Sequence, residues 1–112
     1  MAPLTPAVIH VLLALAGGER HGYGILKEVL RQTHDRMRLG PGTLYGTLQR
    51  LMDLGWVEET DRPARAINTD ERRRYYRLTR SGREALKAEV ERLDELVRAA
   101  RAQRIIPRTS GG

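Results

Sequence analysis

The sequence lacks cysteine altogether, and this absence excludes several kinds of chemistry. Without thiols the chain forms no disulfide, no thiolate metal site and no cysteine nucleophile. Long apolar runs are also missing: the longest, Val11 to Ala16, is far shorter than the roughly 20 residues of a membrane-spanning helix. The first residues have neither the basic start nor the cleavage site of a secretory signal. These absences predict a soluble, cytoplasmic protein that does not contact a membrane.

The sequence has no recognisable set of catalytic groups either. We find no nucleophile beside a base, no pair of carboxylates and no glycine-rich phosphate loop with its lysine. His10, His21 and His34 lack metal-ligand spacing and have no acidic cluster near them, so we expect structural or capping roles for them. The sequence therefore predicts a protein that is not an enzyme and that holds no metal or cofactor.

Positive charge is the most prominent property that the sequence does have. The 112 residues include 20 Lys and Arg against 14 Asp and Glu, a net charge of +6. Most of the excess lies between residues 36 and 83, which contain eleven basic and six acidic side chains. A concentrated basic region suits a ligand with a phosphate backbone, because each neutralised phosphate releases counterions. Charge alone leaves open the alternative of an arginine-rich solvated surface.

Hydrophobic spacing predicts four helices, over residues 6–16, 21–33, 41–54 and 80–104. Between the last two, WVEET (56–60) and RRYYRLT (73–79) predict the two short strands of a hairpin with a long loop. Three helices followed by a hairpin is the order of a winged helix-turn-helix. The predicted fold is therefore mainly α with a small β-hairpin, a winged helix-turn-helix followed by a C-terminal dimerisation helix.

This order also predicts the domain organisation. Residues 1–79 would form the DNA-binding winged helix-turn-helix, residues 80–106 the dimerisation helix, and residues 107–112 a disordered tail. The last helix has apolar residues spaced four, three, four and three apart, which predicts a narrow seam for a second copy of the chain. The seam residues are Leu86, Val90, Leu93, Val97 and Ala100. The alternative is that this helix folds back on the first helix of its own chain.

The third predicted helix contains glycine where glycine weakens a helix. Opposite its apolar stripe lie two glycines, three polar or charged residues and two flanking residues: Gly42, Gly46, Gln49, Arg50, Asp53, Thr43 and Tyr45. A glycine inside a helix costs about 1 kcal/mol relative to alanine. Its place on the outward face indicates that something bulky approaches the backbone, as a DNA groove would. Glycine at position 42 would also leave amide groups open to a phosphate at the positive end of the helix dipole.

Three stretches carry a resemblance to a known family: HGYGI at 21–25, GPGTLYGTLQRLMDLGWVEE at 40–59 and RRRYYRLTRSGREAL at 72–86. In order and spacing they resemble the signatures of the PadR family of bacterial transcriptional regulators. The resemblance implies a homodimer whose third helix enters the major groove, whose wing contacts the flanking backbone and whose last helix dimerises. By position, it places Thr43 and Tyr45 at the DNA. Position 46 is commonly proline in that family and is glycine here.

The hairpin loop and its borders hold the arginines that we expect at the DNA backbone or the minor groove: Arg62, Arg65, Arg72, Arg73 and Arg74. All four tyrosines have more than one interpretation, and Tyr45 could cover the edge of the core instead of contacting DNA. We expect Tyr23 to pack in the core rather than to contact a phosphate, and only one of Tyr75 and Tyr76 to be buried, because neighbours on a strand face opposite ways. We expect Trp56 to be a core residue.

Together these features predict a sequence-specific regulator of transcription that binds double-stranded DNA, a repressor acting as a homodimer on a palindromic operator. The alternative is a winged-helix module for protein interaction. A small-molecule effector is left open as a further partner, and the short last helix, without Trp or Tyr, is typical of a compact subgroup of the family.

Overall fold

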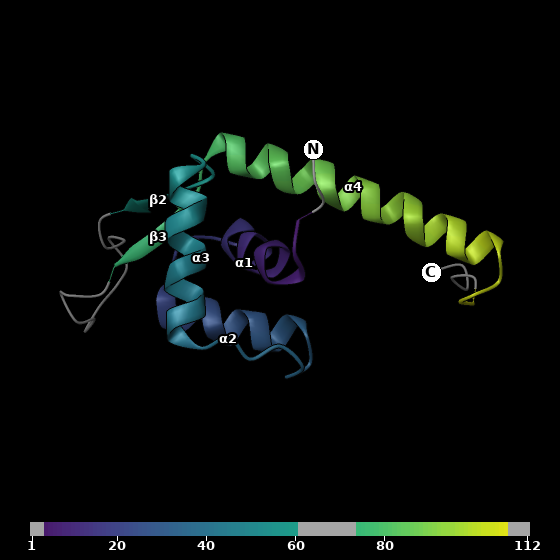
Figure 1. Cartoon of the computed structure of the whole chain (residues 1–112), viewed down its shortest axis with the longest axis horizontal. Helices are drawn as coiled ribbons and strands as arrows, with labels where there is room; N and C mark the ends of the chain where they lie inside the picture. The colour runs from purple at the N-terminus through teal and green to yellow at the C-terminus, as the bar shows by residue number, and fades with distance from the viewer. Residues whose placement is uncertain (1–3, 61–73, 108–112) are drawn as a thin grey trace.

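The computed structural model describes residues 4–60 and 74–107, which form four helices and three short strands (Figure 1). The helices are α1 (Pro6–Ala16), α2 (Gly22–Gln32), α3 (Pro41–Asp53) and α4 (Arg80–Ala102). The strands are β1 (Arg20–His21), β2 (Val57–Thr60) and β3 (Tyr75–Leu78). The predicted winged helix-turn-helix architecture with a long last helix is confirmed.

Helices α1 and α4 each begin after a threonine that caps the first turn. The Thr5 hydroxyl accepts a hydrogen bond from the amide of Val8 and caps α1, which has proline at its start. The Thr79 hydroxyl does the same for the Gly82 amide at the start of α4. Side-chain oxygens at these positions satisfy amide groups that have no partner inside the helix. Local sequence therefore determines where α1 and α4 begin.

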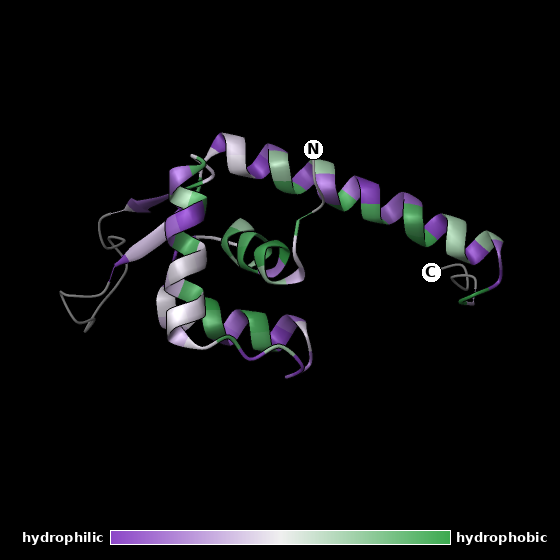
Figure 2. Ribbon diagram, viewed as in Figure 1, coloured by the Kyte–Doolittle hydropathy of each residue, from purple (hydrophilic) through white to green (hydrophobic). Residues whose placement is uncertain are grey.

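The most apolar helix, α1, lies in the middle of the molecule, between α2 and α4 (Figures 1 and 2). It contributes four buried residues, and the other elements contribute their apolar stripes around it. The core consists of Val11, Leu12, Ala14, Leu15, Ile25, Val29, Leu44, Leu48, Leu51, Val57, Tyr76 and Leu86. Burial of this apolar surface around α1 is the main force that holds the helices together.

The sheet has one strand more than the sequence predicted. The order is β1-β3-β2, with both pairs antiparallel, and β1 pairs Arg20 with Tyr76 and His21 with Tyr75. The prediction of a two-stranded hairpin was therefore incomplete, and the predicted helix over 21–33 begins one residue later than expected. Two residues are too few to show an alternating pattern, so β1 had no signal in the sequence. It attaches the start of α2 to the strand that leads out of the wing.

The expectation that only one of Tyr75 and Tyr76 would be buried was wrong, since their exposed fractions are 6% and 2%. Tyr76 joins the core, as alternation along β3 allows. Tyr75 points to the other face, where the ring of His21 meets it edge-on with 5.4 Å between the centroids. The unexpected strand β1 supplies this cover.

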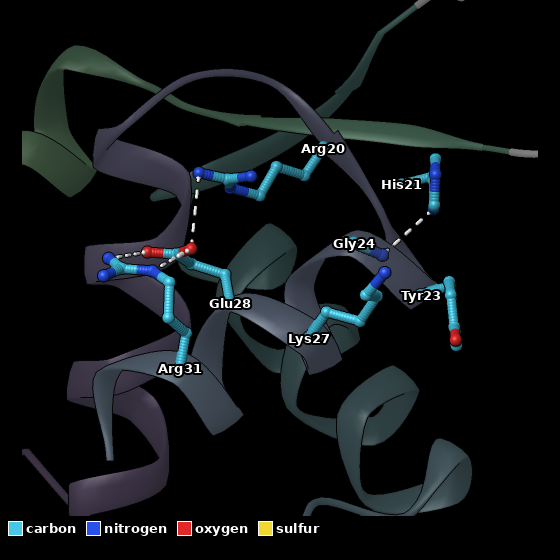
Figure 3. Close-up of a pocket in the computed structure, with 7 residues that line it drawn as sticks. All are labelled: Arg20, His21, Tyr23, Gly24, Lys27, Glu28 and Arg31. Atoms are coloured by element: carbon cyan, nitrogen blue, oxygen red, sulfur yellow. Dashed lines mark hydrogen bonds and ion pairs between the residues drawn. The ribbon is translucent and has the colours of Figure 1, made fainter. Parts of the chain in front are cut away.

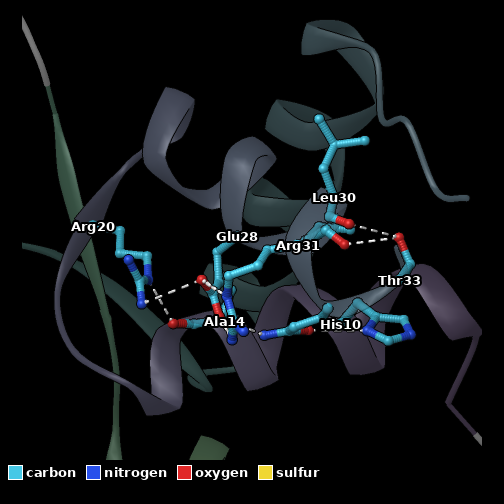
Figure 4. Close-up of polar contacts among 9 residues, drawn as sticks. His10, Ala14, Arg20, Glu28, Leu30, Arg31 and Thr33 are labelled. Carbon is cyan, nitrogen blue, oxygen red and sulfur yellow. Dashed lines mark hydrogen bonds and ion pairs between the residues drawn. The ribbon is translucent and has the colours of Figure 1, made fainter. Parts of the chain in front are cut away.

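Polar contacts fix α2 against α1 and β1 (Figure 4). Glu28 of α2 accepts two hydrogen bonds from Arg31, at 2.9 and 2.6 Å, and lies 3.9 Å from the guanidinium of Arg20. Arg31 is the main cause, ahead of Gln32 and Arg20, of a Glu28 pKa lowered to about 2. Arg20 also donates to the carbonyl of Ala14 in α1 at 2.8 Å. One carboxylate thus links two arginines that come from different elements.

The corner between α3 and β2 is tied to the first turn of α4. Gly55 turns the chain with φ of +78°, a conformation that favours glycine. The Thr79 hydroxyl donates to the carbonyl of Gly55 at 2.6 Å, and the Thr79 amide donates to the carbonyl of Trp56 at 3.0 Å. Gly82 packs directly on that Trp56 carbonyl, whose carbon would lie 2.8 Å from an added Cβ atom. Trp56 itself is only half-buried and packs against the core, so it is not the fully buried core residue that was expected.

Helix α4 is much longer than the part of it that packs on its own chain. Its buried residues, Gly82, Leu86 and Glu89, all lie in the first half, and the second half projects beyond the other helices (Figure 1). The 23 residues span about 34 Å at 1.5 Å per residue. Among the described residues no helix is long and apolar enough to cross a membrane.

The close contact at Gly82 generates a prediction about stability. Gly82→Ala would force the Trp56 carbonyl away, so we expect the free energy of unfolding to fall by about 1–3 kcal/mol although alanine favours helices. Denaturant unfolding followed by circular dichroism measures this change. Gly46→Ala is the matched control, because a Cβ atom there would meet nothing within 4 Å. Equal stability of the Gly82→Ala protein and the wild type would contradict the contact.

Candidate nucleic-acid interface

The outward face of α3 presents the residues that the sequence assigned to DNA. Leu44, Leu48 and Leu51 are buried on the inner face. The other face exposes all six assigned residues of this helix: Gly42, Thr43, Tyr45, Gly46, Gln49 and Arg50. The structure thus brings these six together on one surface that the rest of the described chain leaves open.

The two glycines make this surface low and leave backbone accessible. A Cβ atom built on Gly42 or Gly46 would meet nothing within 4 Å, so neither glycine is required by packing inside the chain. The N-cap of α3 is Gly40, which has no side chain to accept from the first amides. Such a helix start carries partial positive charge and binds anions well. The face can therefore accept a bulky, negatively charged ligand close to its backbone.

Tyr45 is held in place by contact with α2. Its hydroxyl rests on Gly22, where an added Cβ would also approach the ring carbon Cζ to 2.9 Å. The side chain is still 49% exposed. Glycine at position 22 thus permits a half-exposed, fixed tyrosine where α3 meets the first turn of α2.

Gln49 and its neighbours give the face both hydrogen-bonding and charged groups. The Gln49 amide donates to the carboxylate of Asp53, one turn later, at 3.1 Å. This bond orients the amide and leaves its oxygen as a free acceptor toward solvent. Arg50 adds a positive charge beside it. The combination suits contacts with both base edges and phosphates.

Most of the predicted wing arginines, namely Arg62, Arg65, Arg72 and Arg73, lie outside the described residues. Arg74 is exposed at the start of β3, 3.4 Å from the carboxylate of Glu59 on β2. Arg77 pairs with Glu58 at 2.6 Å and lies 3.6 Å from Glu19. The acidic residues of the strands therefore neutralise part of the positive charge that the described wing carries.

The start of α2 adds a polar hollow that the sequence reasoning missed (Figure 3). Tyr23 is 61% exposed there, so the expectation of core packing was wrong. Its ring stacks parallel to His21, with 6.4 Å between centroids, and the Lys27 amine lies 5.5 Å from its centre. Gly22 takes the inward position, which turns the next residue outward by about 100°. The helical spacing of Tyr23 and Lys27 was the available signal.

His21 has the capping role that was expected of it. Its ring nitrogen Nδ1 accepts from the amide of Gly24 at 3.0 Å and closes the start of α2. His10 is also structural, since its Nδ1 lies 3.0 Å from the side-chain oxygen of Gln32. Within residues 4–60 and 74–107 no group of three His, Cys, Asp or Glu could hold a metal ion.

Comparison with known proteins identifies the family. The sequence model of the "Transcriptional regulator PadR-like family" matches residues 11–88, which run from the second half of α1 to the start of α4. The chain belongs to the PadR-like family. It is 37% identical over 90 residues to the transcriptional regulator Rv3488 of Mycobacterium tuberculosis, covering 80% of this chain and 78% of that protein.

Solved structures agree on the fold. A transcriptional regulator from Clostridium thermocellum superposes with a TM-score of 0.69 at 24% identity, over 85% of this chain and 86% of that one. Bacillus subtilis PadR, crystallised in complex with operator DNA, gives a TM-score of 0.64 at 22% identity. The match covers 77% of this chain and 47% of that PadR chain. The resemblance seen in the sequence is confirmed, and with it the expectation of a DNA-binding transcriptional regulator rather than an enzyme.

Because the space at Gly46 is open, we expect one substitution there to have opposite effects on protein stability and on DNA binding. Gly46→Ala should raise the free energy of unfolding by up to about 1 kcal/mol, because alanine favours a helix and the methyl group meets no neighbour. The same methyl group should weaken DNA binding roughly tenfold by keeping the groove away from the backbone. Thermal unfolding and fluorescence anisotropy, with a duplex selected from a random pool by the wild type, measure the two effects. A more stable variant with unchanged affinity would show that DNA does not approach this glycine.

Proposed function

We propose that the chain is a repressor that binds a palindromic operator as a homodimer, with α3 of each subunit in the major groove. The observation that carries this proposal is the outward face of α3, where two glycines with open space lie among exposed polar side chains. The family and the operator complex of the B. subtilis relative support the same use of this helix. A regulator of this kind acts on chromosomal DNA, so we place it in the cytoplasm.

The geometry of α3 suggests a division of work along the helix. An α-helix fits the major groove, and in helix-turn-helix proteins the N-terminal part of the recognition helix reaches the base edges. Thr43 and Tyr45 occupy that part, and Gln49 follows one turn later on the exposed face. The side-chain amide of Gln can pair with adenine by two hydrogen bonds, since its oxygen accepts from N6 and its NH2 group donates to N7. Binding by Gln49 would therefore replace its bond to Asp53 with one to a base.

Contacts with the DNA backbone would come from residues on both sides of α3. On one side lies the hollow at the start of α2, where exposed Tyr23 and Lys27 present a hydroxyl and an amine. On the other side lies the wing, with Arg74 and the arginines of the preceding loop. Phosphate contacts fix the register of a protein on the duplex and supply most of its salt-dependent affinity.

The dimer is proposed from the uncovered seam of α4. Leu86 is buried in the core of its own chain. The first half of α4 therefore packs on its own chain, as the alternative expected, and only the rest of the seam is available to a partner. Further along the helix, Val90 is 44% and Leu96 59% exposed, and Leu93, Val97 and Ala100 are only half-buried. A patch of this kind favours a partner. A two-fold axis there would present two α3 helices to half-sites about 34 Å apart.

Base readout by α3 gives the test of the function. Gln49→Ala should lose roughly 1–3 kcal/mol of binding free energy on the best operator and relax the base preference at one position per half-site. Selection of bound duplexes from a random pool, followed by sequencing, measures that preference. Arg74→Ala is the control, because loss of a phosphate contact should weaken all duplexes alike. Identical base preferences for wild type and Gln49→Ala would exclude Gln49 from the readout.

The seam of α4 predicts the oligomeric state. Leu93→Glu should yield a monomer that binds DNA poorly, because a charge inside an apolar interface has no partner there. Ala88→Glu adds the same charge on the opposite, exposed side of α4 and should leave the dimer intact. Light scattering at micromolar concentration measures the mass of each. A monomeric wild type, or a Leu93→Glu protein that still dimerises, would contradict the proposed interface.

A further inference from the structure

Among the described residues, Glu89 in the middle of α4 is the one buried charged residue, with 7% of its surface exposed. Its carboxylate accepts two hydrogen bonds from the guanidinium of Arg92, at 2.8 and 2.9 Å, in a bidentate pair. The same carboxylate accepts a hydrogen bond from the backbone amide of Leu4 at 3.0 Å. A buried carboxylate is costly unless it is paired and hydrogen-bonded. The Leu4 bond joins positions 85 residues apart, which a helix-stabilising ion pair would not require.

The Leu4 bond follows two other attachments of α4 to the rest of the chain, at Gly82 and at Leu86, which is buried in the core. The first is at the start of the helix, where Gly82 packs on the carbonyl of Trp56. Seven residues, or about 10 Å along the helix, separate Gly82 from Glu89. The bond at Glu89 extends the attached part of the helix to this distance, so α4 can tilt less than it could if only Gly82 and Leu86 held it. The hydrogen bond from the Leu4 amide to Glu89 brings the segment that leads into α1 beside the middle of α4.

Direction matters because α4 is a long lever. From Gly82 to Ala102 the helix runs about 30 Å, so a tilt of about 10° around its start would move the far end by about 5 Å. The half of α4 beyond Glu89 carries the exposed part of the apolar seam, including Val90, and the exposed Leu96 beside it. A tilt would therefore change how two winged helices are placed relative to each other across a dimer axis.

We propose that Glu89, by holding the amide of Leu4, sets the direction of α4 and thereby selects the spacing between the two half-sites of the operator. Glu89 is a positioning residue, since it lies on α4 and acts through the helix rather than by touching DNA. The selection of spacing rests on the proposed dimer and palindromic operator. The effect on helix direction is a property of the single chain and is testable without DNA.

Three variants separate the Leu4 bond from other effects of position 89. Glu89→Ala removes the acceptor and leaves Arg92, half-exposed at 48% of its side chain, free to be hydrated. Glu89→Gln keeps an oxygen that accepts from Leu4 but loses the charge that pairs with Arg92. Glu91→Ala is the control on the opposite face of α4, where it breaks only an exposed pair with Lys87 at 3.9 Å.

The first experiment measures the direction of α4 in the chain itself. Because the protein has no cysteine, spin labels attach only to cysteines introduced at Leu13 of α1 and Gln103 at the end of α4. Pulsed electron resonance, with labelled protein diluted in unlabelled chain, gives the distribution of distances. We expect a broader distribution for Glu89→Ala and the narrow wild-type distribution for Glu89→Gln and Glu91→Ala. An equally narrow distribution for Glu89→Ala would overturn the proposal, whatever the protein does with DNA.

The second experiment measures spacing selectivity. Half-sites selected by the wild type are joined with the preferred spacer and with spacers one or two base pairs longer or shorter. We expect the wild type and Glu89→Gln to bind the preferred spacing about tenfold more tightly than the others, and Glu89→Ala to bind all of them within about twofold. Unchanged selectivity in a Glu89→Ala dimer would overturn the assigned role. A wild-type monomer, or a dimer indifferent to palindromes, would instead contradict the proposed function, and the label distances would still decide what Glu89 does.

Discussion

The attachment of α4 to the corner between α3 and β2 is the contact on which the arrangement of the molecule depends. At this point the end of α3, the start of β2 and the start of α4 share a few backbone groups. Thr79 bonds both Gly55 and Trp56, and Gly82 lets the helix backbone lie against the Trp56 carbonyl. Because Gly82 meets the Trp56 carbonyl without an intervening side chain, a change of rotamer cannot absorb a shift of the helix. A movement of α4 at its start would therefore displace the end of α3 as well.

Three glycines in helices show how differently the same residue is used here. At Gly82 the absence of a side chain lets two backbone segments come into contact. At Gly22 it leaves room for the ring of Tyr45. A Cβ atom at Gly46 would meet nothing within 4 Å, so no packing contact of the described residues offsets the loss of helix stability that glycine causes. The proposed approach of DNA to α3 would explain that cost.

Much of the fold could be predicted because its signals are local. Thr5 and Thr79 mark helix starts by their capping hydroxyls, and Gly40 followed by Pro41 marks the start of α3. Leu44, Leu48 and Leu51 reveal the inner face of α3 by their spacing. The features that escaped depend on residues distant in the chain. The pairing of β1 with β3, which buries Tyr75, and the bond between Leu4 and Glu89 exist only once the helices have packed. No period or composition of a short segment encodes such contacts.

His21 takes part in both the sheet and helix α2, and this affects how the domain unfolds locally. Its backbone pairs with Tyr75 of the sheet, while its ring both caps α2 and covers Tyr75. Separation of the strands would remove the cap of a helix, and fraying of that helix would expose a buried ring of the sheet. Wing and helix-turn-helix are thus coupled into one cooperative unit. In amide hydrogen exchange, such coupling would make β3 and the first turn of α2 lose their protection together.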